Sequence, residues 1–179
     1  MKYFTPEVIA RGQSDDSSVL NEVEARWDEL CERYRAYLDS IKGDFPPGLR
    51  HIEESYYLHD ARVQAMGRRD GAFLVVLQLD TPPQSLLLFS YDLVEEPRID
   101  PQALPEAARF RGDAVEWQYD EVEKVAGQPP TWRQSVLLSN GWEVTLHFRD
   151  VKAQEAQALI PAPSNGPTGL RASAPAGPG

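Results

Sequence analysis

The segment Tyr56-Tyr57-Leu58-His59-Asp60 contains the residue types that acid–base chemistry uses most often. An imidazole titrates near neutral pH, and a neighbouring carboxylate can orient the ring or share a metal ion. Adjacent residues of an extended strand point to opposite faces, so His59 and Asp60 cannot form a simple dyad there. We expect the pair at a bend between a helical layer and a sheet, in a mainly structural role. At such a bend Asp60 accepts backbone N–H groups and His59 packs against aromatic rings.

A second group combines acidic and aromatic side chains. Aromatic rings supply anchoring area at protein interfaces, and carboxylates select a basic partner. The sequence therefore predicts a partner-binding surface made of Trp117, Tyr119, Asp120, Glu121, Glu123 and Trp132. Two plainer interpretations stay open: Trp117 and Tyr119 are core residues, or the acids are a solvated strand end that protects a sheet edge.

A metal centre is the third possibility, because histidine and carboxylate side chains are common ligands of divalent ions. The residues available for it are His59, Asp60, Asp120, Glu121 and His147. The chain lacks the spacings of an HExxH helix or a calcium loop, and it lacks a GxSxG, P-loop or Rossmann glycine pattern. We predict no catalytic residue, no metal and no cofactor. A metal-dependent hydrolase that uses His59, Asp60 and His147 stays as the alternative.

The charge of the chain narrows the choice of partner. The 179 residues carry a formal net charge of -10 at pH 7. Nucleic acids and anionic membranes repel such a protein, so neither is an expected partner, whereas a basic protein is. The single cysteine, Cys31, cannot form an internal disulfide, and its place on an apolar helix stripe predicts a buried, inert thiol. The predicted location is cytoplasmic.

Helices are expected in the first third of the chain. Thr5 and Pro6 predict the start of a short helix that ends near Gly12. Apolar residues at three- and four-residue steps predict an amphipathic helix from Val19 to Ile41 with a stop at Gly43. One or two further helical turns are expected over 49–55.

Strands are expected in the rest of the folded part. Asp70-Gly71 and Asn140-Gly141 predict two hairpins with two-residue type I′ turns, the second joining strands over 132–139 and 142–150. Further strands are expected over 86–94 and 115–125, and the proline-rich stretch 97–112 predicts a connection with one helical turn near 103–109. On the last strand, the face that carries Trp142, Val144, Leu146 and Phe148 is expected to pack against the helices.

These elements predict one α+β domain over residues 1–151. Its N-terminal helices (1–55) pack on one face of an antiparallel sheet of about five to seven strands (56–151). From Lys152 onward the chain is rich in Pro, Gly and Ala, so we predict a disordered tail over 152–179.

Three segments carry a resemblance to known proteins. Met1-Lys-Tyr-Phe-Thr5, Leu58-His-Asp-Ala-Arg-Val63 and Ser135-Val-Leu-Leu-Ser-Asn-Gly-Trp142 resemble a bacterial family of small proteins of unknown function that open with MKYFT. The resemblance spans about the first 150 residues, implies a bacterial, intracellular domain and assigns no catalytic residue. A looser similarity extends to immunity proteins of toxin systems, many of which are also small, acidic and α+β.

Three hypotheses about function follow. The leading one is a non-enzymatic protein-binding module, of which an immunity- or antitoxin-like role is the sharpest form. The second is the metal-dependent hydrolase. The third is a structural subunit that dimerises through the Val19–Ile41 helix or a free sheet edge, although the oligomeric state itself is left undetermined.

Overall fold

The computed structural model describes residues 1–82, 84–110 and 112–156. Three α-helices come first: α1 (Pro6–Arg11), α2 (Ser17–Ile41) and α3 (Pro47–Ser55). The helix predicted from Val19 begins two residues earlier, because Asp16 caps its N-terminus through the N–H of Ser18. Beyond Ile41 a 3₁₀ turn, η1 (Lys42–Asp44), continues through Gly43. Across the described residues, no helix combines the length and the apolar character that crossing a membrane requires.

Seven antiparallel strands follow the helices, so the predicted fold class is confirmed. They are β1 (Ala61–Arg69), β2 (Ala72–Gln78), β3 (Leu86–Leu93), β4 (Arg98–Asp100), β5 (Glu116–Val125), β6 (Thr131–Leu138) and β7 (Glu143–Ala156). The short strand β4 and the 3₁₀ turn η2 (Glu106–Ala108) lie within the connection predicted over 97–112.

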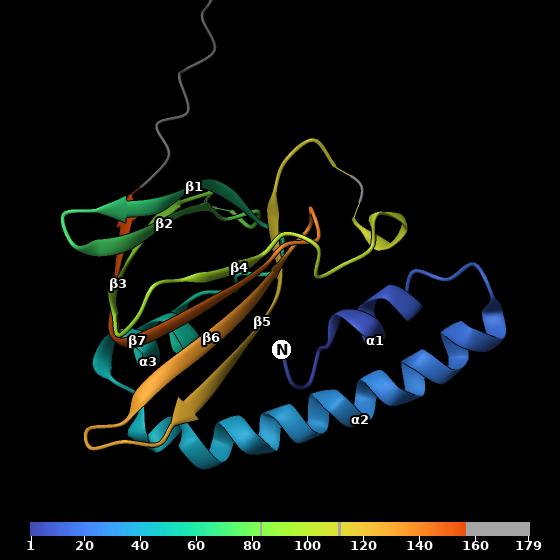
Figure 1. The fold of residues 1–179 in the computed structure, drawn as a ribbon, viewed down its shortest axis with the longest axis horizontal. Helices are drawn as coiled ribbons and strands as arrows, with labels where there is room; N and C mark the ends of the chain where they lie inside the picture. Colours follow the sequence, from blue (N-terminus) through green and yellow to red (C-terminus); the bar gives the residue numbers. More distant parts are fainter. Residues whose placement is uncertain (83, 111, 157–179) are drawn as a thin grey trace, which may run out of the picture.

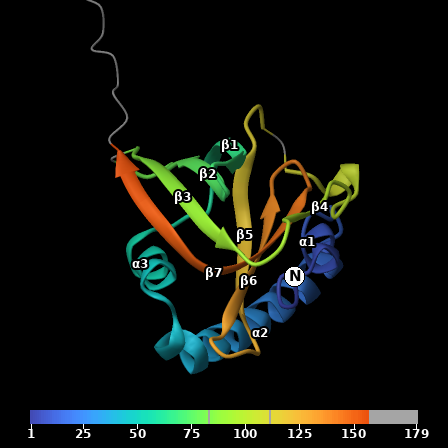
Figure 2. The same ribbon diagram turned by 60° about the vertical axis from the view of Figure 1, so that its left-hand side comes forward.

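The sheet closes on itself into a barrel (Figures 1 and 2), because β3 pairs with β7 as well as with β2. β7 is long enough to pair with β4 near its start and with β3 along its second half. Its last residues, Lys152 to Ala156, pair with Ser90 to Leu86 of β3. The prediction of a disordered tail from Lys152 is therefore wrong for 152–156, where backbone pairing compensates for the loss of apolar side chains. The rest of the predicted tail lies outside the described residues.

Closure gives the molecule two separate hydrophobic cores. The inner core fills the barrel and contains Trp117, Trp132, Phe89, Tyr91, Val144, Leu146 and Phe148 among its buried side chains. The outer core lies between the helices and the outside of the barrel, around Tyr3, Phe4, Ile9, Leu30, Leu104 and Leu137. Most of the α2 stripe does not pack on Val144, Leu146 and Phe148 as predicted, because that face turns into the barrel; at the end of the helix, Ile41 does belong to the inner core. Trp142, at 40% exposed, belongs to neither core.

The two hairpins differ. In the first, Asp70 (φ 52°) and Gly71 (φ 84°) both have positive φ, as a type I′ turn requires. In the second, Gly141 has a positive φ but Asn140 does not, so the predicted type I′ turn is wrong. Neighbouring backbone groups hold this turn instead: Ser139 donates its N–H to the carbonyl of Glu116, and Gly141 accepts the N–H of Leu104.

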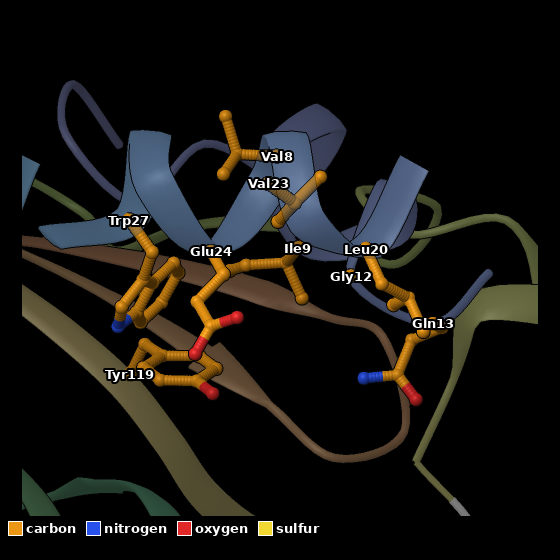
Figure 3. Close-up of a pocket in the computed structure, with 9 residues that line it drawn as sticks. All are labelled: Val8, Ile9, Gly12, Gln13, Leu20, Val23, Glu24, Trp27 and Tyr119. Atoms are coloured by element: carbon orange, nitrogen blue, oxygen red, sulfur yellow. The ribbon is translucent and has the colours of Figure 1, made fainter. Parts of the chain in front are cut away.

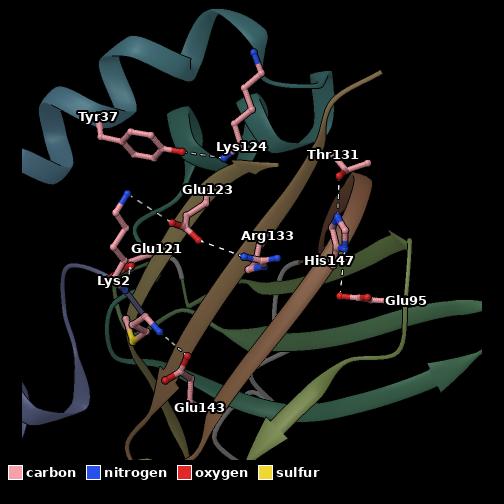
Figure 4. A network of polar contacts seen from close by, with 11 residues as sticks. Lys2, Tyr37, Glu95, Glu121, Glu123, Lys124, Thr131, Arg133, Glu143 and His147 are labelled. Atoms are coloured by element: carbon pink, nitrogen blue, oxygen red, sulfur yellow. Dashed lines mark hydrogen bonds and ion pairs between the residues drawn. The ribbon is translucent and has the colours of Figure 1, made fainter. Parts of the chain in front are cut away.

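β5 extends beyond its partner β1. Only two residue pairs join these strands, Ala61–Trp117 and Arg62–Glu116, so the outer edge of β5 from Tyr119 onward has no partner strand among the described residues. Two tyrosines of α2 cap this edge. The hydroxyl of Tyr34 accepts the N–H of Val122 at 2.7 Å. Figure 4 shows the second cap, in which the hydroxyl of Tyr37 accepts the N–H of Lys124 at 3.0 Å. The stripe of α2 thus packs on the N-terminal segment and on this edge of β5.

Glu121 fixes the N-terminal segment to the outside of β5. Its side chain is only 1% exposed, and its carboxylate accepts the backbone N–H groups of Lys2 (2.6 Å), Tyr3 (2.7 Å) and Phe4. These charge-assisted bonds bring the aromatic rings of Tyr3 and Phe4 into the outer core.

Replacement of Glu121 by Gln should lower the free energy of unfolding by about 2–4 kcal/mol, because the amide leaves buried N–H donors without an acceptor. Urea denaturation measures this value. Glu123→Gln on the same strand is the control and should cost less than about 1 kcal/mol, since Glu123 makes only long, partly exposed ion pairs with Lys2 and Arg133. Equal losses in the two variants would contradict the anchoring role.

Gly48 lets α3 lie directly on β7. A Cβ at this position would lie 1.5 Å from the carbonyl oxygen of Val151. We expect Gly48→Ala to destabilise the protein by more than about 3 kcal/mol, because the backbone of α3 or β7 must shift. Gly43→Ala is the control, since a Cβ on Gly43 would meet nothing within 4 Å, and thermal unfolding compares the two variants. A Gly48→Ala variant as stable as Gly43→Ala would show that α3 packs differently.

Candidate binding pocket

A pocket of about 580 Å³ opens beside β5, between α2 and α3. We call it the β5 pocket. It is lined by Phe4, Cys31, Tyr34, Arg35, Ile52, Glu53, Tyr56, Tyr57, Leu58, His59, Gln118, Tyr119 and Asp120. It lies where β5 has already separated from β1, and hydroxyl caps occur beyond it at Val122 and Lys124 but not at Asp120. The pocket is therefore a part of the free edge of β5 that the side chains of α2 leave uncovered.

His59 and Asp60 lie at the bend that the sequence predicted, between α3 and β1. Asp60 has a positive φ of 65°, and its N–H donates to the carbonyl of Trp117 at 2.9 Å. Its carboxylate accepts a hydrogen bond from the side chain of Gln118 at 3.0 Å, rather than the backbone N–H groups that we expected.

The ring of His59 lies against Tyr57 and Tyr119, with centroids 6.0 and 5.3 Å away, as the sequence predicted. Its Nδ1 contacts the carbonyl of Gln118, and because a carbonyl only accepts, this nitrogen carries the hydrogen. Its Nε2 lies 3.7 Å from a carboxylate oxygen of Asp60, beyond hydrogen-bond distance. The arrangement orients the imidazole and holds the bend against β5.

Asp120 lies at the base of the pocket and belongs to a buried polar chain. Its two carboxylate oxygens accept hydrogen bonds from Trp117 Nε1 (3.0 Å) and Gln134 Nε2 (2.7 Å), and Gln134 accepts one from the hydroxyl of Tyr91 at 2.9 Å. Burial raises the pKa of Asp120, although the bonds from Trp117 and Gln134 oppose this shift.

Glu53 lines the pocket from α3, facing the same space as Asp120. Its side chain is exposed to solvent. Burial first, and the charge of Asp120 second, raise the pKa of Glu53 from 4.5 to about 7. Sequence reasoning missed Glu53, because an acid in a short helix is normally a solvated surface group. The signal that could have found it is its position three and four residues before Tyr56 and Tyr57, which also line the pocket.

The predicted partner-binding surface is not assembled as one surface. Trp117 and Trp132, each 1% exposed, are inner-core residues, and Trp132 packs edge-on against Phe45 with centroids 5.1 Å apart. Glu121 is buried as the N-terminal anchor. The prediction is therefore corrected for these three residues: closure of the barrel turns Trp117 and Trp132 inward, and the N-terminal segment covers Glu121 on the outside of β5. Of the six, Tyr119 and Asp120 line the β5 pocket.

The remaining predicted residues lie elsewhere. Glu123 is partly exposed beside Lys2 and Arg133, and His147 on β7 contacts the hydroxyl of Thr131 (2.7 Å) and the carboxylate of Glu95 (3.2 Å) (Figure 4). The structure does not bring His147 together with His59 and Asp60. Within residues 1–82, 84–110 and 112–156, no group of three or more His, Cys, Asp or Glu side chains is arranged to hold a metal ion.

Cys31 is half-buried at the wall of the pocket rather than fully buried as predicted, and burial raises the pKa of its thiol. A raised thiol pKa disfavours the nucleophilic thiolate, in agreement with an unreactive side chain.

A second, more apolar cavity of about 350 Å³ lies between α1 and α2 (Figure 3). Val8, Ile9, Leu20, Val23 and Trp27 form its hydrocarbon walls, and Glu24 supplies its carboxylate. It shares Tyr119 with the β5 pocket but contains none of the other predicted site residues.

No protein-family description, curated protein or solved structure matches this chain. The resemblance to the MKYFT family therefore stays a prediction, and the properties of the site derive from its own geometry.

The raised pKa of Glu53 predicts a pH-dependent stability. In the unfolded chain Glu53 ionises near pH 4.5, whereas in the folded chain it ionises near pH 7, so stability is lost as the pH rises between these values. Glu53→Gln removes this loss. The variant should match the natural chain at pH 4 and exceed its free energy of unfolding at pH 8 by on the order of 1 kcal/mol, a value reduced by solvent screening in the pocket mouth.

Urea denaturation at both pH values measures this difference. Glu54→Gln, next to Glu53 on the same helix but not among the residues that line the pocket, is the control and should change stability by less than about 0.5 kcal/mol at either pH. The same difference at pH 4 and pH 8 for Glu53→Gln would contradict the raised pKa of Glu53.

Proposed function

We propose that this protein is a non-enzymatic binding protein that recognises a basic protein partner through the β5 pocket. The observation that carries the proposal is the composition of the pocket, where four tyrosines surround a concave site that also contains carboxyl groups. Large aromatic rings provide most of the binding energy at interfaces when a partner removes them from water. The net charge of -10 favours long-range attraction of a basic protein.

Tyr57 is the residue through which a partner would first engage the pocket. It is 68% exposed, the largest exposed fraction among the exposed large hydrophobic residues, and it stands beside the ring of His59. A rigid aromatic side chain loses little conformational entropy when it is covered, so it is suited to anchor a partner.

An immunity- or antitoxin-like role is the sharpest form of this proposal. Neutralising a basic toxin needs tight, electrostatically guided binding and no chemistry of its own. The looser similarity in the sequence to immunity proteins supports the same interpretation by analogy.

Affinity capture with the full chain tests the proposal. We expect a basic protein from a bacterial lysate to be retained at roughly 50 mM salt and released at about 0.5 M, because salt screens the attraction. Tyr57→Ala should weaken the interaction with the identified partner at least about tenfold. Trp142→Ala is the control, since it removes an exposed aromatic ring from the β6–β7 turn, outside the pocket. Equal binding by wild type and Tyr57→Ala would refute the pocket as the binding site.

A further inference from the structure

The charged groups of the β5 pocket are not paired with one another. Among the described residues, no hydrogen bond or ion pair within 4 Å reaches the carboxylate of Glu53 or the guanidinium of Arg35, although both line the pocket. The acids of β5 behave differently, and Glu121 and Glu123 both have partners. Glu53 is exposed to solvent at the pocket, so its carboxylate is open to a donor that comes from outside the chain.

The side of the pocket formed by α3 and β5 offers acceptors to a cationic group. Glu53 offers two carboxylate oxygens. By strand alternation the backbone N–H and carbonyl of Asp120 both point to the same edge as the N–H groups of Val122 and Lys124, and no hydroxyl of the described residues caps them. Tyrosine rings form the remaining walls, and their faces attract a cation within about 6 Å.

We propose that the β5 pocket receives a cationic side chain of the partner, an arginine guanidinium or a lysine ammonium, which pairs with Glu53 and is covered by the tyrosine rings. This inference rests on the proposed function and names the chemical group that the site would recognise. Arginine fits better than lysine, because its five donors satisfy several acceptors at once and its plane stacks on aromatic rings.

The pocket should release protons when the cation binds. Burial and the charge of Asp120 raise the pKa of Glu53 to about 7, so near neutral pH part of the population is protonated, and a cation favours the charged form. Affinity should therefore rise with pH across this range. The titratable or charged groups that face the cation are Cys31, Tyr34, Arg35, Glu53, Tyr56, Tyr57, His59, Tyr119 and Asp120. The positive charge of Arg35, on the α2 side of the pocket, would repel the cation and so keep it near Glu53.

The test is a titration of the full chain followed by NMR, with N-acetyl-arginine methylamide as the probe. The neutral citrulline analogue has nearly the same shape and is the matched ligand control. We expect shifts confined to pocket residues and an affinity at least about tenfold higher for arginine than for citrulline. Glu53→Gln should abolish this preference, while Glu54→Gln should keep it. Equal affinities for the two ligands, or an unchanged preference in Glu53→Gln, would overturn the proposal.

Two further arms separate the remaining alternatives. Affinity for the arginine probe should increase from pH 5.5 to pH 8 in the wild type and stay constant in Glu53→Gln; a pH-independent wild type would count against the role of Glu53. A peptide with one arginine between glycines should bind more tightly than agmatine, and the reverse order would assign the pocket to a small amine. If the arginine probe binds in a Glu53-dependent way but affinity capture retains no partner, the proposed function alone is refuted. If a captured partner depends on Tyr57 but binds Glu53→Gln as well as wild type, this inference alone is refuted.

Discussion

The free edge of β5 is the constraint on which the rest of this structure depends. Backbone N–H and C=O groups inside a protein must find partners, and β5 runs past the end of β1 with one edge unpaired. Side chains from other elements supply the partners: Tyr34 and Tyr37 from α2, and His59 from the bend before β1. This requirement fixes where the long helix lies on the barrel. It also leaves an opening between His59 and Tyr34, and that opening is the β5 pocket.

Two neighbouring acids of β5 have different roles: Glu121 stabilises the outer layer, and Asp120 lies between the barrel interior and the pocket. Glu121 points outward, where three backbone N–H groups of the N-terminal segment converge on its carboxylate. Asp120 points toward the barrel interior, where an indole and an amide are its partners and burial raises its pKa. The first acid stabilises the outer layer through charge-assisted bonds. The second acid and Glu53 both line the pocket, where ionisation of the two carboxyl groups costs free energy. A bound cation would lower that free energy.

The side chains that line the β5 pocket are held in place by contacts that leave their rings free to meet the proposed partner. His59 is oriented by the carbonyl of Gln118, and Tyr34 by the N–H of Val122. Their rings still face the pocket. Such preorganisation lowers the entropic cost of binding, since the partner does not have to order the site. The same rigid frame explains why the exposed ring of Tyr57 and the unpaired carboxyl group of Glu53 are the groups best placed to meet a ligand.

The sequence by itself determined the local elements, because helix periodicity, capping residues and turn residues act over a few positions. It predicted α2, both hairpins, the bend at His59 and Asp60, and the antiparallel sheet. It could not decide closure, because pairing of β3 with β7 joins residues 55 to 70 positions apart and has no local signature. Because of closure, Trp117 and Trp132 are inner-core residues rather than the predicted surface residues, and β7 extends to Ala156. Only the tertiary structure brought Glu53 and Asp120 to one pocket, since α3 is placed by its packing on β7, far from β5 in the sequence.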